Sequence, residues 1–205
     1  MKTIKIISIS FLLFSSINAQ IENKENIFIQ AMENMDEFIE FLSYPNDANY
    51  KDDIYTLIDF IENKFNSLDF KTTRLLTETL PLLLAEREID SDLKTVLIYL
   101  HLDGQPIDIS KWDQDDPFSP VFKKKVKDNF EIFNWNDIKD YSYEELDNED
   151  VRIFARSSSD AKGPVMMLIQ AIRLMNSQNI NQKYNIKLIM DFEEEKSSPS
   201  LPFAV

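Results

Sequence analysis

The chain has 205 residues, of which 43% are hydrophobic and 28% are charged, which is enough for one domain with a buried core. Its 36 acidic residues exceed its 22 lysines and arginines, and the formal net charge of -14 argues against nucleic-acid binding, which needs a basic face. Cysteine is absent. Disulfides and thiolate metal ligands are therefore excluded, and a metal site would have to use His, Asp and Glu.

The N-terminal residues have the pattern of a signal peptide. Lys2 and Lys5 precede an apolar run at 6–13, and small or polar residues follow at 15–19. The apolar run is too short to span a bilayer comfortably. We expect residues 1–19 to be a signal peptide and residues 20–205 to be secreted or periplasmic, with no membrane attachment after cleavage. A buried first strand or an uncleaved anchor is the alternative.

Two helices and two strands are predicted before the middle of the chain. Apolar residues three and four apart predict amphipathic helices over Glu25–Leu42 and Asp52–Asn66. The segments Phe70–Leu76 and Pro81–Arg87 are rich in apolar and β-forming residues and are separated by a polar break, so we expect two paired strands.

The continuous apolar run Val96–Leu100 predicts a central strand that is buried on both faces. It ends at His101, the only histidine of the chain, and Asp103 follows two positions later. Residues two apart on an extended segment point the same way, so Asp103 can orient the imidazole while its other nitrogen binds a metal. A purely structural histidine is the alternative at this point.

The segment Ile107–Val126 has no clear periodicity and is predicted to be irregular. A calcium loop is conceivable at its aspartates, Asp113, Asp115 and Asp116, but the alternating spacing and late glutamate of such loops are missing, which favours a solvated loop. A short strand at Val151–Ala155 and a helix at Val165–Met175 follow.

Asp160 lies on the loop that enters this helix, where a carboxylate can also serve simply as a cap. A buried strand at Asn185–Met190 is followed by Glu193, Glu194 and Glu195. Chemistry in open α/β sheets gathers beyond the carboxyl ends of the strands. We therefore expect His101, Asp160 and a pair of glutamates to meet there, with the ligands and the base of a metal-assisted hydrolase.

These motifs resemble those of the two-zinc exopeptidase family of aminoacylases, glutamate carboxypeptidases and carnosine-type dipeptidases (peptidase family M20). Its signature His-x-Asp-x-x-Pro is matched at 101–106, and Arg-Gly-Ser-Ser-Asp-x-Lys-Gly is matched at 156–163 except for one glycine. Glu-Glu-x-Gly-Ser is matched at 194–198, again except for its glycine. The sequences DGQP and KGPV are similar to the dipeptidase branch, and the resemblance extends from about Glu25 to the last residue.

The resemblance implies two divalent metal ions, zinc first, with manganese or cobalt as alternatives. It implies that His101, Asp160 and Glu195 are metal ligands, with Asp160 bridging the two ions. Asp103 would orient the ring of His101, and Glu194 would be the general base. Glu193 and Glu194 are the next-best pair, although Ser198 favours the first register. Adjacent glutamates can divide these roles only if the chain turns there.

The implied fold is α/β, a three-layer zinc-exopeptidase-like domain with a mixed, largely parallel sheet. Ser157 and Ser197 replace glycines of the motifs, at a cost of about 1 kcal/mol if those positions need a positive φ. The second histidine ligand and the lid domain of the family lie further along its chains, and His101 has no second histidine beside it here. We therefore expect the chain to be the truncated N-terminal part of such an enzyme.

The function predicted from the resemblance is a metal-dependent dipeptidase or exopeptidase that cleaves a peptide bond by metal-activated water. The substrate would be a dipeptide or short peptide, with no nucleic acid as partner, and the full-length form could be a homodimer. Two alternatives stay open: an N-acyl amino acid deacylase of the same family, and a non-catalytic fragment that binds cations or a partner.

Overall fold

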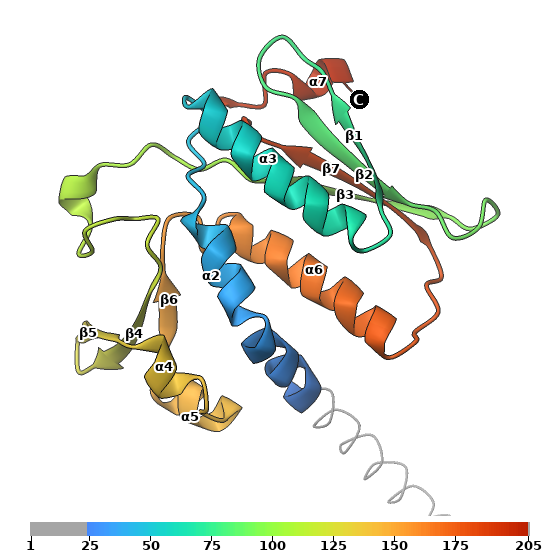
Figure 1. Cartoon of the computed structure of the whole chain (residues 1–205). Helices are drawn as coiled ribbons and strands as arrows, with labels where there is room; N and C mark the ends of the chain where they lie inside the picture. Colours follow the sequence, from blue (N-terminus) through green and yellow to red (C-terminus); the bar gives the residue numbers. More distant parts are fainter. Residues whose placement is uncertain (1–23, 205) are drawn as a thin grey trace, which may run out of the picture.

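A computed structural model describes residues 24–204 (Figure 1). Residues 24–33 are helical, and the other α-helices are α2 (Met35–Ser43), α3 (Lys51–Asn66), α4 (Trp135–Ile138), α5 (Tyr143–Asn148), α6 (Lys162–Ser177) and α7 (Leu201–Ala204). The strands are β1 (Lys71–Leu75), β2 (Leu82–Arg87), β3 (Thr95–His101), β4 (Val121–Val126), β5 (Asn129–Phe133), β6 (Arg152–Phe154) and β7 (Asn185–Asp191). Two 3-10 turns lie at Ile109–Lys111 and Glu194–Lys196. The predicted signal peptide, residues 1–19, lies outside the described residues.

The main sheet has the strand order β1-β2-β7-β3. β1 and β2 form the predicted pair, which is antiparallel, β2 also runs antiparallel to β7, and β3 runs parallel to β7. The predicted mixed α/β fold is confirmed, with a smaller parallel part than expected. The pair that matters for the site is the parallel one, because its two carboxyl ends meet at the same edge of the sheet.

The core lies between this sheet and the helices α3 and α6. The apolar face of α3, including Ile54, Leu57 and Ile61, is fully buried, and the sheet contributes Leu83 and Leu188. Helices α3 and α6 lie on the same face of the main sheet (Figure 1). The described residues thus form two layers, and the opposite face of the sheet is partly open.

The prediction that β3 is buried on both faces is wrong for the described residues. The side chains of Val96, Leu97 and Tyr99 are 41%, 62% and 44% exposed. β3 is an edge strand, and the helices cover only the face that carries Ile98 and Leu100, both of which pack against the core.

The last six residues of the segment predicted to be irregular form strand β4 instead. It is the centre of a small antiparallel sheet with the order β5-β4-β6, which lies apart from the main sheet in Figure 1. Three consecutive lysines, Lys123–Lys125, hide the alternation expected of a strand. The strand before Asp160, β6, belongs to this small sheet and not to the main sheet as expected.

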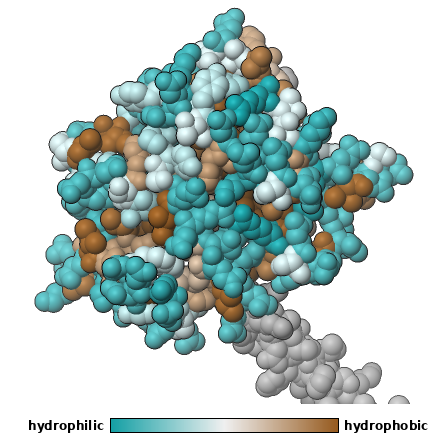
Figure 2. Space-filling model, in the orientation of Figure 1, coloured by the Kyte–Doolittle hydropathy of each residue, from teal (hydrophilic) through white to brown (hydrophobic). Residues whose placement is uncertain are grey.

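The first predicted helix is interrupted at Asn34, whose side chain donates a hydrogen bond to the Gln30 carbonyl oxygen (2.7 Å). The second, α3, forms as predicted. No helix within residues 24–204 is both long and apolar enough to cross a membrane. The face shown in Figure 2 is mostly hydrophilic, with hydrophobic residues in small separate groups, as the high content of charged residues leads one to expect.

Candidate active site

The site begins where β3 and β7 end side by side. His101 and Asp191 are register partners, and the backbone N–H of Leu102 donates to the Asp191 carbonyl oxygen (2.9 Å). The carboxyl ends of two parallel strands therefore place the segments after His101 and after Asp191 next to each other, as the sequence led us to expect.

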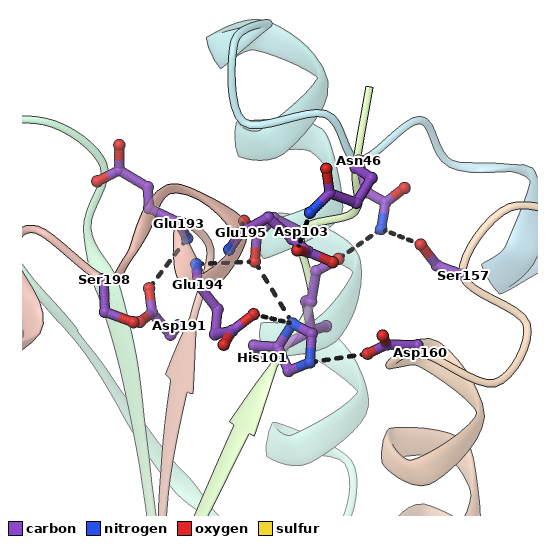
Figure 3. Close-up of polar contacts among 12 residues, drawn as sticks. Asn46, His101, Asp103, Ser157, Asp160, Asp191, Glu193, Glu194, Glu195 and Ser198 are labelled. Atoms are coloured by element: carbon purple, nitrogen blue, oxygen red, sulfur yellow. Dashed lines mark hydrogen bonds and ion pairs between the residues drawn. The ribbon is translucent and has the colours of Figure 1, made fainter. Parts of the chain in front are cut away.

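Asp103 ties these two segments together. Its side chain is completely buried, and its two carboxylate oxygens accept hydrogen bonds from the backbone N–H groups of Glu194 (3.1 Å) and Glu195 (3.0 Å). Figure 3 shows this carboxylate between the imidazole of His101 and the 3-10 turn at Glu194–Lys196, which we call the glutamate turn. A buried carboxylate is tolerated because these donors compensate for its lost hydration. Asp103 thus fixes the position of the glutamate turn as well as facing His101.

The imidazole of His101 lies among three carboxylates (Figure 3). Its Nε2 is 3.0 Å from Asp160 Oδ1, and its Nδ1 is 3.6 Å from Asp103 Oδ1 and 3.7 Å from Glu194 Oε2. The last two distances are electrostatic contacts and too long for hydrogen bonds. The pKa of His101 is raised, chiefly by Asp103 and further by Glu194 and Asp160, although burial lowers it.

The three glutamates after β7 point in different directions (Figure 3). Glu193 is only 3% exposed, and its carboxylate accepts hydrogen bonds from the hydroxyl of Thr79 and the backbone N–H of Leu80 (3.2 Å). Glu194 faces His101, whereas Glu195 accepts a hydrogen bond from the side-chain amide of Gln105. The 3-10 turn at 194–196 separates the directions of the two neighbours. Glu193 is therefore not available for the alternative register.

The loops that carry the site converge on Asn46, which is completely buried. Its side-chain amide donates to the Leu102 carbonyl oxygen (2.7 Å) and to Ser157 Oγ (2.9 Å), and its backbone carbonyl accepts from the N–H of Gly104 (2.8 Å). Asn46 thus links the loop after His101 to the loop before Asp160. The sequence suggested only a helix break here, and one sequence contains no signal that this asparagine is buried.

Lys162, at the start of α6, connects the loop of Asp160 to the end of α2. Its side chain is fully buried, and its ammonium donates hydrogen bonds to the carbonyl oxygens of Phe41 (3.1 Å), Leu42 (3.4 Å) and Tyr44. Burial lowers the pKa of Lys162 to about 7. The ammonium caps the carboxyl end of α2, where free carbonyls favour a cation. A motif lysine is therefore part of the scaffold that holds Asp160, which lies two residues away.

The side chains present fit part of a zinc-type site. A partly buried imidazole beside a carboxylate is a donor pair that zinc prefers, and His101 Nδ1 has no hydrogen-bond partner among the described residues. However, no group of three or more His, Asp or Glu side chains within residues 24–204 is arranged to hold a metal ion, the Asp113–Asp116 cluster included. Of the predicted ligands, His101 and Asp160 are brought together, and Glu195 is turned toward Gln105.

Comparison with known proteins agrees with this fold and site. Peptidase family M20/M25/M40 matches residues 134–203. β-Ala-His dipeptidase of Mus musculus is 28% identical over 121 residues, which are 59% of this chain and 19% of that relative. The chain therefore spans about a fifth of the length of this curated relative.

Two solved structures show the same fold over most of the chain. Human carnosine dipeptidase 1 superposes with a TM-score of 0.64 and 20% identity, covering 86% of this chain and 35% of that one. The M20 family metallo-carboxypeptidase Sso-CP2 from Sulfolobus solfataricus gives a TM-score of 0.61 and 27% identity over 82% of this chain and 32% of that one. The fold is the one that these two peptidases share. The predicted resemblance to peptidase family M20 is confirmed, and the family match itself lies at residues 134–203.

Proposed function

We propose that the chain provides part of the catalytic site of a metal-dependent peptidase that cleaves dipeptides or short peptides. The observation that carries the proposal is the meeting of His101, Asp103, Asp160 and Glu194 at the carboxyl ends of β3 and β7. The similarity to peptidase family M20/M25/M40 gives this cluster a peptidase context. The similarity to a β-Ala-His dipeptidase favours dipeptides over N-acyl amino acids as substrates.

His101 through Nε2 and Asp160 would hold a divalent ion, most simply zinc, with Glu195 as a further ligand if it leaves Gln105. Divalent metal ions, when bound, would polarise the scissile carbonyl and acidify a water molecule. Asp103 would keep the imidazole oriented through its contact with Nδ1, as carboxylates do behind metal-bound histidines. Asp160 would supply a carboxylate to the metal site.

Glu194 is our candidate for the general base. Its side chain is 42% exposed, and within the described residues its carboxylate has only the 3.7 Å contact with His101 Nδ1. It can therefore accept a proton from water and deliver it to the leaving amine. Because the backbone N–H of Glu194 is held by buried Asp103, the base would keep its position relative to the imidazole.

The experiment measures zinc binding and hydrolysis of β-alanyl-histidine by the purified chain, with an N-acetyl amino acid as second substrate. The variants are Asp160→Asn, which should lose zinc affinity, and Glu194→Gln, which should retain zinc but lose about 100-fold or more in rate. Asp115→Asn, an exposed acid elsewhere, is the matched control.

Zinc-dependent cleavage that fails in Glu194→Gln would support the peptidase, and preference for the N-acetyl substrate would support the deacylase instead. Zinc binding that depends on His101 without any hydrolysis would favour the non-catalytic alternative. Zinc binding equal in His101→Ala and in the parent chain would contradict the proposed site.

We also propose that the chain is exported through its predicted signal peptide. The support is the arrangement of Lys2, Lys5 and the apolar run at 6–13. Expression in a secreting host followed by mass spectrometry of the product tests it. A mature chain that begins at Gln20 is expected, and an intracellular product that retains Met1 or Lys2 would contradict export.

A further inference from the structure

A second cavity lies away from the candidate active site, against the small sheet. It is an open cavity of about 620 Å³, lined by the loop at 111–114, by Lys123 of β4, by residues 128–130 and by Phe154 at the end of β6. Trp112, Phe130 and Phe154 give it an aromatic lining. None of its lining residues belongs to the site around His101. The other six lining residues are polar or charged. The volume is in the range of small-molecule sites.

The cavity contains a buried ammonium group that lacks a hydrogen-bond acceptor. Lys123 is only 5% exposed, and within residues 24–204 its Nζ donates no hydrogen bond. Its neighbours are the ring of Phe154, 4.8 Å from Nζ to the centroid, and Asp113 Oδ2 at 3.7 Å. The Asp113 side chain is 93% exposed, so water screens this pair.

The ammonium of Lys123 lines the cavity and has no protein acceptor within hydrogen-bond distance among residues 24–204. A ligand anion could accept charge-assisted hydrogen bonds from it, and the neighbouring Phe130 and Phe154 rings would pack against the body of the same ligand.

The charges around the cavity select between kinds of anion. Lys111 and Lys123 are balanced by Asp113 and Asp128, so the lining is neutral as a whole. A multiply charged phosphate would meet two carboxylates here without enough cations to compensate. A zwitterion matches the lining better, because its carboxylate and its ammonium each have an opposite charge available.

We propose that this cavity binds a free amino acid with a large apolar side chain. Its carboxylate accepts from the ammonium of Lys123, its α-ammonium lies toward Asp113 and Asp128, and its side chain packs on Phe130 and Phe154. This site is independent of the proposed peptidase activity, since it shares no residue with that site.

The test uses the fluorescence of Trp112, which lines the cavity. The chain has two tryptophans, and the other, Trp135, stacks on Phe122 outside the cavity lining, so Trp135→Phe leaves Trp112 as the single reporter. L-Phenylalanine is titrated beside phenethylamine, which lacks the carboxylate, 3-phenylpropionate, which lacks the ammonium, and inorganic phosphate. We expect L-phenylalanine to bind saturably. Phenethylamine should bind with an affinity that is lower by about tenfold or more.

Lys123→Met should weaken L-phenylalanine binding by about tenfold or more, the loss expected for one charge-assisted hydrogen bond. Lys125→Met makes the same chemical change at an exposed position of the same strand and should leave binding unchanged within about twofold. Thermal unfolding of both variants checks that they fold, and ligand-observed NMR provides a second measure of binding. Unchanged affinity in a folded Lys123→Met, tighter binding of phosphate, or no binding of L-phenylalanine would each overturn the proposal.

Discussion

The chain has only two glycines, Gly104 and Gly163, and both lie in the segments that carry the family motifs. A Cβ added to Gly104 would lie 2.5 Å from Ser157 Oγ, and one added to Gly163 would lie 2.4 Å from the Ser158 carbonyl oxygen. Close approach, rather than backbone conformation, explains these glycines. Serine, by contrast, occupies the positions that do have positive φ, 61° at Ser157 and 71° at Ser197, where the family motif has glycine. The expected strain at these two positions is therefore present in the structure.

Gly163→Ala should destabilise the chain by about 1–3 kcal/mol, because the new methyl group meets backbone that cannot rotate away. This loss should exceed the gain in helix propensity, which is about 1 kcal/mol at most for glycine to alanine. Gly104→Ala should cost less, since the atom it meets belongs to a side chain that can turn. Urea unfolding followed by circular dichroism measures both, and a Gly163→Ala variant as stable as the parent would contradict the packing described here.

At the scale of elements, α2 is the junction that holds the helical layer together. Glu37, in its first turn, accepts from Arg173 of α6 (Nη2 at 3.0 Å) and forms an ion pair with Lys64 of α3 (2.8 Å). The other end of α2 is capped by Lys162. Charged side chains of both α3 and α6 thus contact α2, and one of them, Lys162, lies two residues after Asp160.

Glu37→Gln should lower the free energy of unfolding by about 1 kcal/mol at pH 7. Burial raises the pKa of Glu37, but hydrogen bonds from Arg173 and Lys64 outweigh it and hold the pKa below its usual value of 4.5. Because the pKa of Glu37 is lower in the folded state, its carboxylate stabilises the fold at pH values above the pKa of the unfolded chain. This contribution is lost as the pH falls through the folded-state pKa.

The difference in the free energy of unfolding between the parent chain and Glu37→Gln should therefore be largest near pH 7 and should decrease below about pH 4. Glu33→Gln, an exposed glutamate of the preceding helical turn, should change stability little at either pH. A difference for Glu37→Gln that is the same at pH 3 and pH 7 would show that the charge is not what holds the helices.

Elements with strong periodicity were predictable, and elements set by tertiary contacts were not. The three- and four-residue spacing in α3 fixes its buried face, and the apolar run of β7 fixes a strand. β4 escaped prediction because its lysines contradict the usual pattern, and Lys123 is buried only by the fold around it. For the site, His101, Asp103 and Glu194 could be identified from the predicted strand ends and from the motifs. Asn46 and Glu193 acquire their roles from contacts more than 50 residues away along the chain, which one sequence does not reveal.

At the scale of the whole molecule, a metal ion would couple three distant parts of the chain. His101 is the last residue of β3, Asp160 lies on the loop between β6 and α6, and Glu194 follows β7. An ion held by these residues would therefore connect the main sheet to the loop that leaves the small sheet. Such a ligand binds the folded state and not the unfolded chain, and it stabilises the fold by mass action.

Zinc should therefore raise the midpoint of thermal unfolding, by an amount corresponding to about 2.7 kcal/mol when free zinc is about 100-fold above its dissociation constant. The chain is strongly acidic, so scattered surface carboxylates could also bind cations, and calcium at the same concentration is the control for that effect, because it prefers oxygen ligands alone. We expect zinc to shift the midpoint more than calcium, and the zinc-specific part to disappear in His101→Ala and Asp160→Asn. An equal response to both ions, or a zinc shift that persists without the imidazole, would mean that the surface charge and not the cluster at the strand ends binds the metal.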